Sequence, residues 1–165
     1  SNKPGIVRVY FYRAGEEVRA NGEPADVINA INQELGEKSE LLTRNLLESR
    51  GFTQLDGGKY NTVNGFDHVF ITEIDGVEHV MIVDTKQLKN GSAALANTNN
   101  GVQMSRQWVD NVLENLDYDG DMAQANLLLK SKIDSAKTNG TLLKGVAGLD
   151  KKTGEFSVVK LDEIF

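Results

Sequence analysis

Cysteine is absent from the chain, which excludes disulfides, thiolate metal sites and cysteine nucleophiles. Only two histidines are present, too few to build a metal site from histidine alone. No apolar run reaches the roughly 18 residues that a membrane-spanning helix needs, so we expect no membrane span. If the chain binds a metal, the ligands must come mainly from its carboxylates.

Positive charge is also scarce, because 18 Lys and Arg face 24 Asp and Glu, for a net charge of −6. Phosphate contacts favour basic surfaces, so this balance weighs against nucleic acid as a partner. The alternative is that metal-binding carboxylates account for part of the acidity and a local basic face lies elsewhere. The residues available for such a backbone-binding face, or for an ordinary solvated surface, are Lys130, Lys132, Lys137, Lys144, Lys151 and Lys152.

What is present suits one globular domain of 165 residues, 39% hydrophobic and 25% charged. We expect a core over about 37–116, an N-terminal extension over 1–36, and a C-terminal helix and β-hairpin over 117–165. Strands are predicted at 6–12, 52–55, 66–74, 77–83, 142–149 and 155–161. Helices are predicted before Gly36 and at 37–50, 103–116 and 122–133. The order predicts an α/β (α+β) fold with a mixed sheet flanked by helices.

Two acidic residues are symmetric about a predicted turn. Asp75-Gly76 is a strong hairpin signal between two apolar strands. Asp67 lies about eight residues before this turn and Asp84 about eight after it, so antiparallel pairing places them nearly opposite each other.

Asp84 and Lys86 are two residues apart on the second strand, so both side chains project from one face and Thr85 from the other. Glu40, on the predicted helix over 37–50, is a third acid. Carboxylates that hold a divalent metal can neutralise charge on a phosphodiester and activate water, and a nearby lysine can assist. Hard oxygen ligands favour magnesium or manganese. The pattern therefore indicates a metal-dependent nuclease.

The order of these residues resembles the PD-(D/E)xK (restriction endonuclease-like) nuclease superfamily. The matching elements are a helix with Glu40, then Arg50-Gly51-Phe52, Gly65-Phe66-Asp67 and Val83-Asp84-Thr85-Lys86. The run from Gln103 to Trp108 is similar to a Q-M-S-x-x-W helix start in toxin domains of this fold. Such domains lie at the C-terminus of contact-dependent growth inhibition and other polymorphic toxins.

The resemblance implies roles for five residues. Glu40, Asp67 and Asp84 would bind or orient the metal (Mg or Mn, with Zn as a third candidate). Lys86 would be the catalytic lysine, and Gln103 an accessory active-site residue.

The resemblance further implies a toxin that is secreted or delivered from the cell surface and acts in the target-cell cytoplasm. DNA is the first choice of substrate and tRNA the second. A cognate immunity protein would be the partner in the producing cell. The resemblance also gives Ser105 and Trp108 a supporting role and Gln87 a substrate contact.

Each residue also has an ordinary structural interpretation. Asp84 and Lys86 could be a surface ion pair, Asp67 a turn cap, and Glu40 or its neighbour Glu37 a solvated helix residue. His68 should point away from Asp67 and be structural, and Trp108 fits a hydrophobic core. The acidic composition keeps open a non-catalytic binding or immunity-type module.

Overall fold

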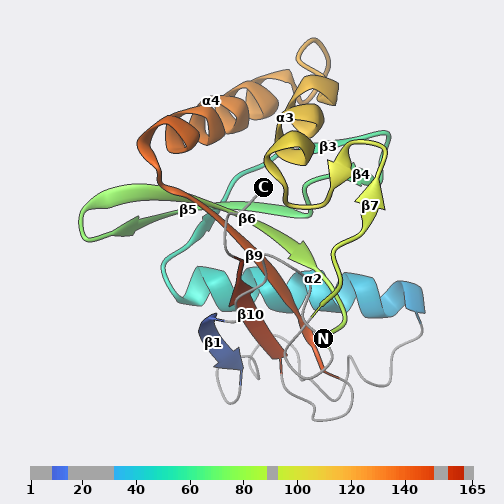
Figure 1. The fold of residues 1–165 in the computed structure, drawn as a ribbon, viewed down its shortest axis with the longest axis vertical. Coiled ribbons are helices and arrows are strands. Elements are labelled where there is room, and N and C mark those ends of the chain that lie inside the picture. Colours follow the sequence, from blue (N-terminus) through green and yellow to red (C-terminus); the bar gives the residue numbers. More distant parts are fainter. Residues whose placement is uncertain (1–8, 15–31, 89–92, 151–155, 162–165) are drawn as a thin grey trace.

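The computed structural model describes residues 9–14, 32–88, 93–150 and 156–161. A six-stranded mixed sheet of order β1-β10-β9-β6-β5-β2 forms its centre (Figure 1). Among the described strands, β6 and β9 are the only parallel neighbours of this sheet, and its other neighbours are antiparallel. The sheet strands are β1 Val9–Ala14, β2 Thr53–Gln54, β5 His68–Ile74, β6 Val77–Thr85, β9 Leu142–Leu149 and β10 Phe156–Lys160. Two small ladders, β3 Lys59–Tyr60 with β4 Asn64–Gly65 and β7 Asn97–Thr98 with β8 Gly101–Val102, lie outside it.

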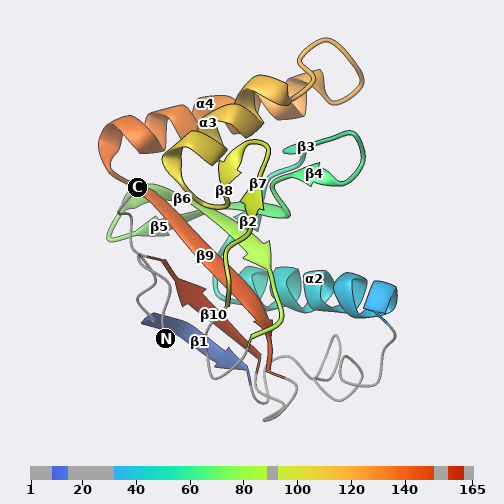
Figure 2. The ribbon, with the colours of Figure 1, turned by 45° about the vertical axis from the view of Figure 1, so that its right-hand side comes forward.

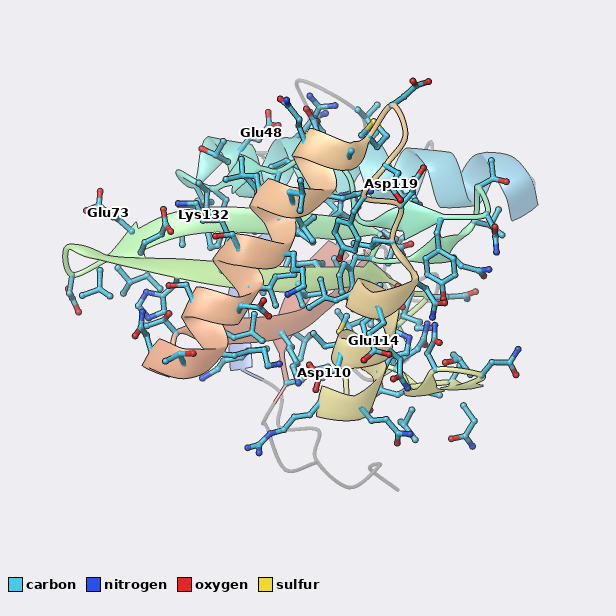
Figure 3. The ribbon with its side chains drawn as sticks, turned by 90° about the horizontal axis from the view of Figure 1, so that it is seen from above. Glu48, Glu73, Asp110, Glu114, Asp119 and Lys132 are labelled. Atoms are coloured by element: carbon cyan, nitrogen blue, oxygen red, sulfur yellow. The ribbon has the colours of Figure 1, made fainter. Side chains whose placement is uncertain are left out.

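In the described part of the chain, three helices cover the two faces of the sheet: α2 Asn32–Ser49, α3 Arg106–Asn115 and α4 Ala123–Asn139. Helix α2 lies on one side, and α3 and α4 lie together on the other, an arrangement that the turned view also shows (Figure 2). Seen from above, Asp110 and Glu114 lie on α3 and Lys132 on α4 (Figure 3). The fold is therefore mixed α/β with a layer of helix on each face.

Two apolar clusters show how strand alternation serves both layers. Val80 and Ile82 of β6 belong to the cluster beneath α3 and α4, whereas Met81 and Val83 belong to the cluster that faces α2. A strand buried on both faces is apolar at consecutive positions, which explains the unbroken run in β6. Asp84 follows this pattern on the α3–α4 face, so burial of the strand carries the carboxylate into the protein.

The predicted hairpin is confirmed. Strands β5 and β6 pair from Ile74 with Val77 to His68 with Val83. The next position in this register places Asp67 opposite Asp84, as counting outward from the turn predicts. The predicted C-terminal strands also form, and Gly145 to Leu149 of β9 pair with β10.

Three predicted boundaries were wrong. Helix α2 continues through Gly36, since one glycine costs about 1 kcal/mol and helix-forming neighbours outweigh it. Helix α4 extends past Ile133 to Asn139, where Gly140 adopts the left-handed conformation that ends it. Helix α3 begins only after its N-cap Ser105, so Gln103 lies before the helix rather than in it.

The predicted N-terminal strand is found from Val9 onward, paired with β10. The short helix expected before Gly36 falls largely on 24–31, outside the described residues. Within the part of the chain that the structure describes, no helix is long and apolar enough to cross a membrane.

Candidate active site at the end of the hairpin

Asp67 and Asp84 meet at the end of the β5–β6 hairpin. The backbone N–H of Thr85 donates to Asp67 Oδ2 at 2.9 Å, which fixes one carboxylate against the strand of the other. The two carboxyl groups also share a hydrogen bond. Asp84 is buried at 5% exposed, whereas the Asp67 side chain is half-buried at 23% exposed.

The pKa values of the two carboxyl groups shift in opposite directions. Burial, helped by the neighbouring Asp67 carboxylate, raises the pKa of Asp84 to about 7. Burial also acts to raise the pKa of Asp67, but the hydrogen bonds from Asp84 and the Thr85 N–H and the charge of Lys59 lower it overall. Two carboxylates side by side repel each other when both are ionised, so their proximity favours a proton on the pair or a cation beside it.

Lys86 places its ammonium beside this pair. Its Nζ lies 3.2 Å from Asp84 Oδ2 and donates to Gln103 Oε1 at 2.6 Å. The same amide oxygen accepts the backbone N–H of Ala96 at 3.1 Å, so Gln103 is itself held in place. The lysine is thereby fixed from two sides, by a carboxylate of the sheet and by an amide that follows β8.

The backbone at Lys86 is fixed by close packing against β9. The Lys86 N–H donates to the Ala147 carbonyl at 2.8 Å. A Cβ on Gly148 would lie 1.6 Å from the Lys86 carbonyl oxygen, so only glycine permits this approach. The parallel pairing of β6 and β9 thus sets the height at which the lysine leaves the sheet.

Lys59, which the sequence analysis did not identify, joins Glu40 to the pair. Its Nζ lies 3.7 Å from Asp67 Oδ1 and 3.8 Å from Glu40 Oε1. Glu40 therefore reaches the site through a lysine, which is what brings α2 into it. The side chain of Glu37, the alternative helical acid, lies outside the described part. We call Glu40, Lys59, Asp67, Asp84, Lys86 and Gln103 the carboxylate–lysine cluster.

A buried amide on α4 positions Lys59. Asn126, 1% exposed, accepts the Gly58 N–H at 2.9 Å through Oδ1. A Cβ on Gly57 would lie 2.4 Å from that same oxygen, and the φ of +89° at Gly57 also favours glycine. The Gly57-Gly58 turn before a lysine was the one local signal available, but its partner lies on a distant helix.

Other predicted residues have structural positions. His68 is buried and stacks on Phe70, and burial lowers its pKa to about 4, in keeping with a structural role. Trp108 lies in the core, as predicted, and its ring packs edge-to-face against Phe66. Ser105 caps α3 by accepting the Trp108 N–H at 3.1 Å. Gln87 is exposed.

The donor set suits a divalent cation at Asp67 and Asp84. Both supply hard carboxylate oxygens, and a cation there would relieve the repulsion that their shared hydrogen bond now relieves. Lys59 lies between Asp67 and Glu40, so Glu40 is not adjacent to the pair. Accordingly, no group of three His, Cys, Asp or Glu side chains suited to a metal occurs among the described residues.

The exposure of Asp84 and Lys86 decides whether they form an ordinary surface ion pair. The pair of Asp84 and Lys86 is no surface ion pair, since their side chains are only 8% and 22% exposed.

Comparisons of the chain with models of protein families, with curated proteins and with solved structures find no match.

Proposed function

We propose that this chain is a metal-dependent endonuclease of the PD-(D/E)xK, restriction endonuclease-like type. One observation carries the proposal: a buried carboxylate pair whose partner lysine is held 3.2 Å from Asp84 and 2.6 Å from Gln103. Ordinary surface charges are not buried in this way. Ionisable groups with strongly shifted pKa values that lie close together are typical of functional sites. The frame of α2 followed by antiparallel β5 and β6 supports the resemblance on which the type rests.

Asp67 and Asp84 would hold the metal, Mg²⁺ or Mn²⁺ with Zn²⁺ as a third candidate. A bound divalent cation supplies charge neutralisation on the phosphodiester oxygens and a more acidic water. Glu40 is placed to act through Lys59 rather than by contact with the same ion. Its role as a metal ligand stays a prediction.

Lys86 has the position to serve the attacking water or a non-bridging phosphate oxygen. Its Nζ carries three protons, and Asp84 and Gln103 engage two of them. The remaining N–H can donate to the substrate or to the water. Gln103 orients this group, and Lys59 offers a second cation on the other side of Asp67.

DNA is the first choice of substrate and tRNA the alternative. By the resemblance, the chain would be a toxin domain that is delivered into the cytoplasm of competing bacteria and neutralised by a cognate immunity protein. The acidic surface implied by a net charge of −6 would suit a basic patch on that protein.

Incubation with plasmid DNA and with bulk tRNA, each with Mg²⁺, Mn²⁺ or Zn²⁺, tests this function. Metal-dependent cleavage of either that is lost in Asp84→Ala and in Lys86→Ala is expected. Absence of cleavage with every metal would refute the enzyme. Cleavage that survives both substitutions would refute the site.

A second candidate is a non-catalytic binding module. The observation in its favour is that the cluster's charges already compensate one another, from Glu40 through Lys59 to Asp67 and from Asp84 to Lys86. Such a module would bind a partner without cleaving nucleic acid, and Asp84→Ala would leave that binding intact.

A further inference from the structure

A cavity of about 370 Å³ opens between α3, the end of α4 and the start of β9, away from the carboxylate–lysine cluster. Arg106, Lys137 and Lys144 line it, one from each element, together with the apolar side chains of Val109, Ala136 and Leu142. No acidic side chain is among the described residues that line it. We call this cavity the basic pocket.

The basic pocket is distinct from the other lysines of α4. Lys130 pairs with Asp134 at 2.6 Å and Lys132 with Glu78 at 2.9 Å, both as partly exposed ion pairs. Lys137 also has an acidic neighbour, Asp110, at 2.5 Å, but its chain lines the pocket. Lys144 is 5% exposed, although it carries one of the most strongly hydrated side chains. Of the six lysines considered for a backbone-binding face, Lys151 and Lys152 lie outside the described residues.

The pocket and the carboxylate–lysine cluster share one face of the sheet. In the parallel ladder, Asp84 pairs with Val146 and Ile82 with Lys144, two residues along. One strand spacing and two residues of rise put the Cα atoms of Asp84 and Lys144 about 8 Å apart. Arg106 comes three residues after Gln103, which contacts Lys86.

An anion that touches both places must carry more than one negative group. A nucleic acid strand does so, because its phosphates follow one another at about 3.4 Å of helix rise. Three cations gathered around one cavity suit a phosphate, which accepts several charge-assisted hydrogen bonds at once and would compete with Asp110 for Lys137. Because the basic pocket concentrates three cations at one place, a chain with a net charge of −6 can still bind nucleic acid there.

We infer that the basic pocket binds a backbone phosphate of the nucleic acid substrate, a few nucleotides from the bond that the carboxylate–lysine cluster cuts. This inference rests on the proposed function for its substrate. The pocket contributes affinity and register, and it takes no part in the chemical step.

The test compares two double variants with equal loss of charge. Arg106→Gln with Lys137→Gln removes two cations from the pocket, and Lys130→Gln with Lys132→Gln removes two from the exposed face of α4. Circular dichroism and thermal unfolding establish that both fold. Binding of a short single-stranded DNA, a DNA duplex and bulk tRNA is measured without metal, so that no cleavage occurs.

The pocket variant should bind about tenfold or more weakly than wild type, because it loses two charge-assisted contacts. Its plot of log affinity against log salt should be shallower by about one, the effect of one lost phosphate contact, uniformly across sequences. The α4 variant should bind as wild type does. Asp110→Asn, which removes the acid beside Lys137, should tighten binding.

Equal affinities and salt slopes for the two double variants would overturn the inference. So would a pocket variant that loses binding to an acidic partner protein and keeps it to nucleic acid. Cleavage assays separate this outcome from failure of the function. Unchanged KM in the pocket variant refutes the pocket alone, and metal-free binding with the predicted pattern but no cleavage refutes the nuclease alone.

Discussion

The carboxylate–lysine cluster and the basic pocket differ in the signs of charge that they gather. The cluster holds both signs of charge: Lys59 lies between Glu40 and Asp67, and Lys86 lies beside Asp84, so each carboxylate has a lysine within 4 Å. The pocket gathers cations from three elements around one cavity, and Asp110 lies beside one of them, Lys137. Compensated charges hold reacting groups in fixed positions, whereas charges of one sign attract a ligand of the other. We therefore infer that the cluster determines the rate of the chemical step and that the pocket contributes affinity for the substrate.

The largest expected effect breaks the cluster. Lys86→Met keeps the length of the side chain and removes its charge, and it should lower kcat by about 10²–10³-fold, the usual effect of losing one stabilising donor. KM should change little. Lys132→Met, on the exposed face of α4, is the matched control and should retain full activity. Equal losses in the two variants would show that charge in general, and not the position of Lys86, matters.

A smaller effect is expected at Gln103, a positioning residue. Gln103→Ala removes the acceptor of the Lys86 ammonium and should lower kcat by about 10-fold or more, as is typical when a supporting partner of an active-site group is lost. Gln103→Glu keeps an oxygen at the same place and should restore most of the rate. If both variants lose the rate equally, Gln103 does not act by accepting from Lys86.

A triple variant tests whether the carboxylate–lysine cluster and the basic pocket act independently. In the triple variant Lys86→Met, Arg106→Gln and Lys137→Gln, the loss of kcat from the cluster and the rise of KM from the pocket should multiply. The free-energy effects of substitutions at independent sites add to within about 0.5 kcal/mol. A larger departure, measured by steady-state kinetics, would show that the two regions act as one.

The smallest effect concerns stability without metal. Because the folded-state pKa of Asp84 is raised to about 7 from an ordinary 3.8, the folded protein holds a proton that the unfolded chain releases. The stability this confers is present at low pH and is lost as pH rises through about 4 to 7. Asp84→Asn removes that loss and should stabilise the metal-free protein at pH 8 by about 1–3 kcal/mol.

Urea unfolding with a chelator at pH 5 and pH 8 measures this difference. Glu114→Gln, the same change at an exposed position on α3, is the control and should not alter it. His68 contributes the opposite slope, because burial lowers its pKa to about 4 and stability falls as pH drops below its ordinary 6.5. A wild-type protein as stable as Asp84→Asn at pH 8 would contradict the buried pair.

The two regions also differ in how far sequence predicts them. The meeting of Asp67 and Asp84 follows from local information, since the Asp75-Gly76 turn fixes an antiparallel register and register fixes which residues face each other. Asp84 and Lys86 follow from strand alternation alone. This part of the site needed no knowledge of distant contacts.

Lys59 and the basic pocket depend on packing between distant segments. Lys59 is placed by a turn that Asn126 holds from α4. Arg106, Lys137 and Lys144 come together only because α3, α4 and β9 pack on one another. Predicted helix boundaries were wrong where a residue is compatible with two structures. Gly36 is an example, because a glycine can end a helix or lie within one.

Diffraction at the manganese absorption edge, from crystals grown with Mn²⁺, tests the central claim most directly. The account predicts an anomalous peak within about 2.0–2.6 Å of carboxylate oxygens of both Asp67 and Asp84. The same crystals of Asp84→Asn should lose that peak. A protein that cleaves nucleic acid with Mn²⁺ but binds the ion elsewhere, or that shows no peak at this pair, would contradict it.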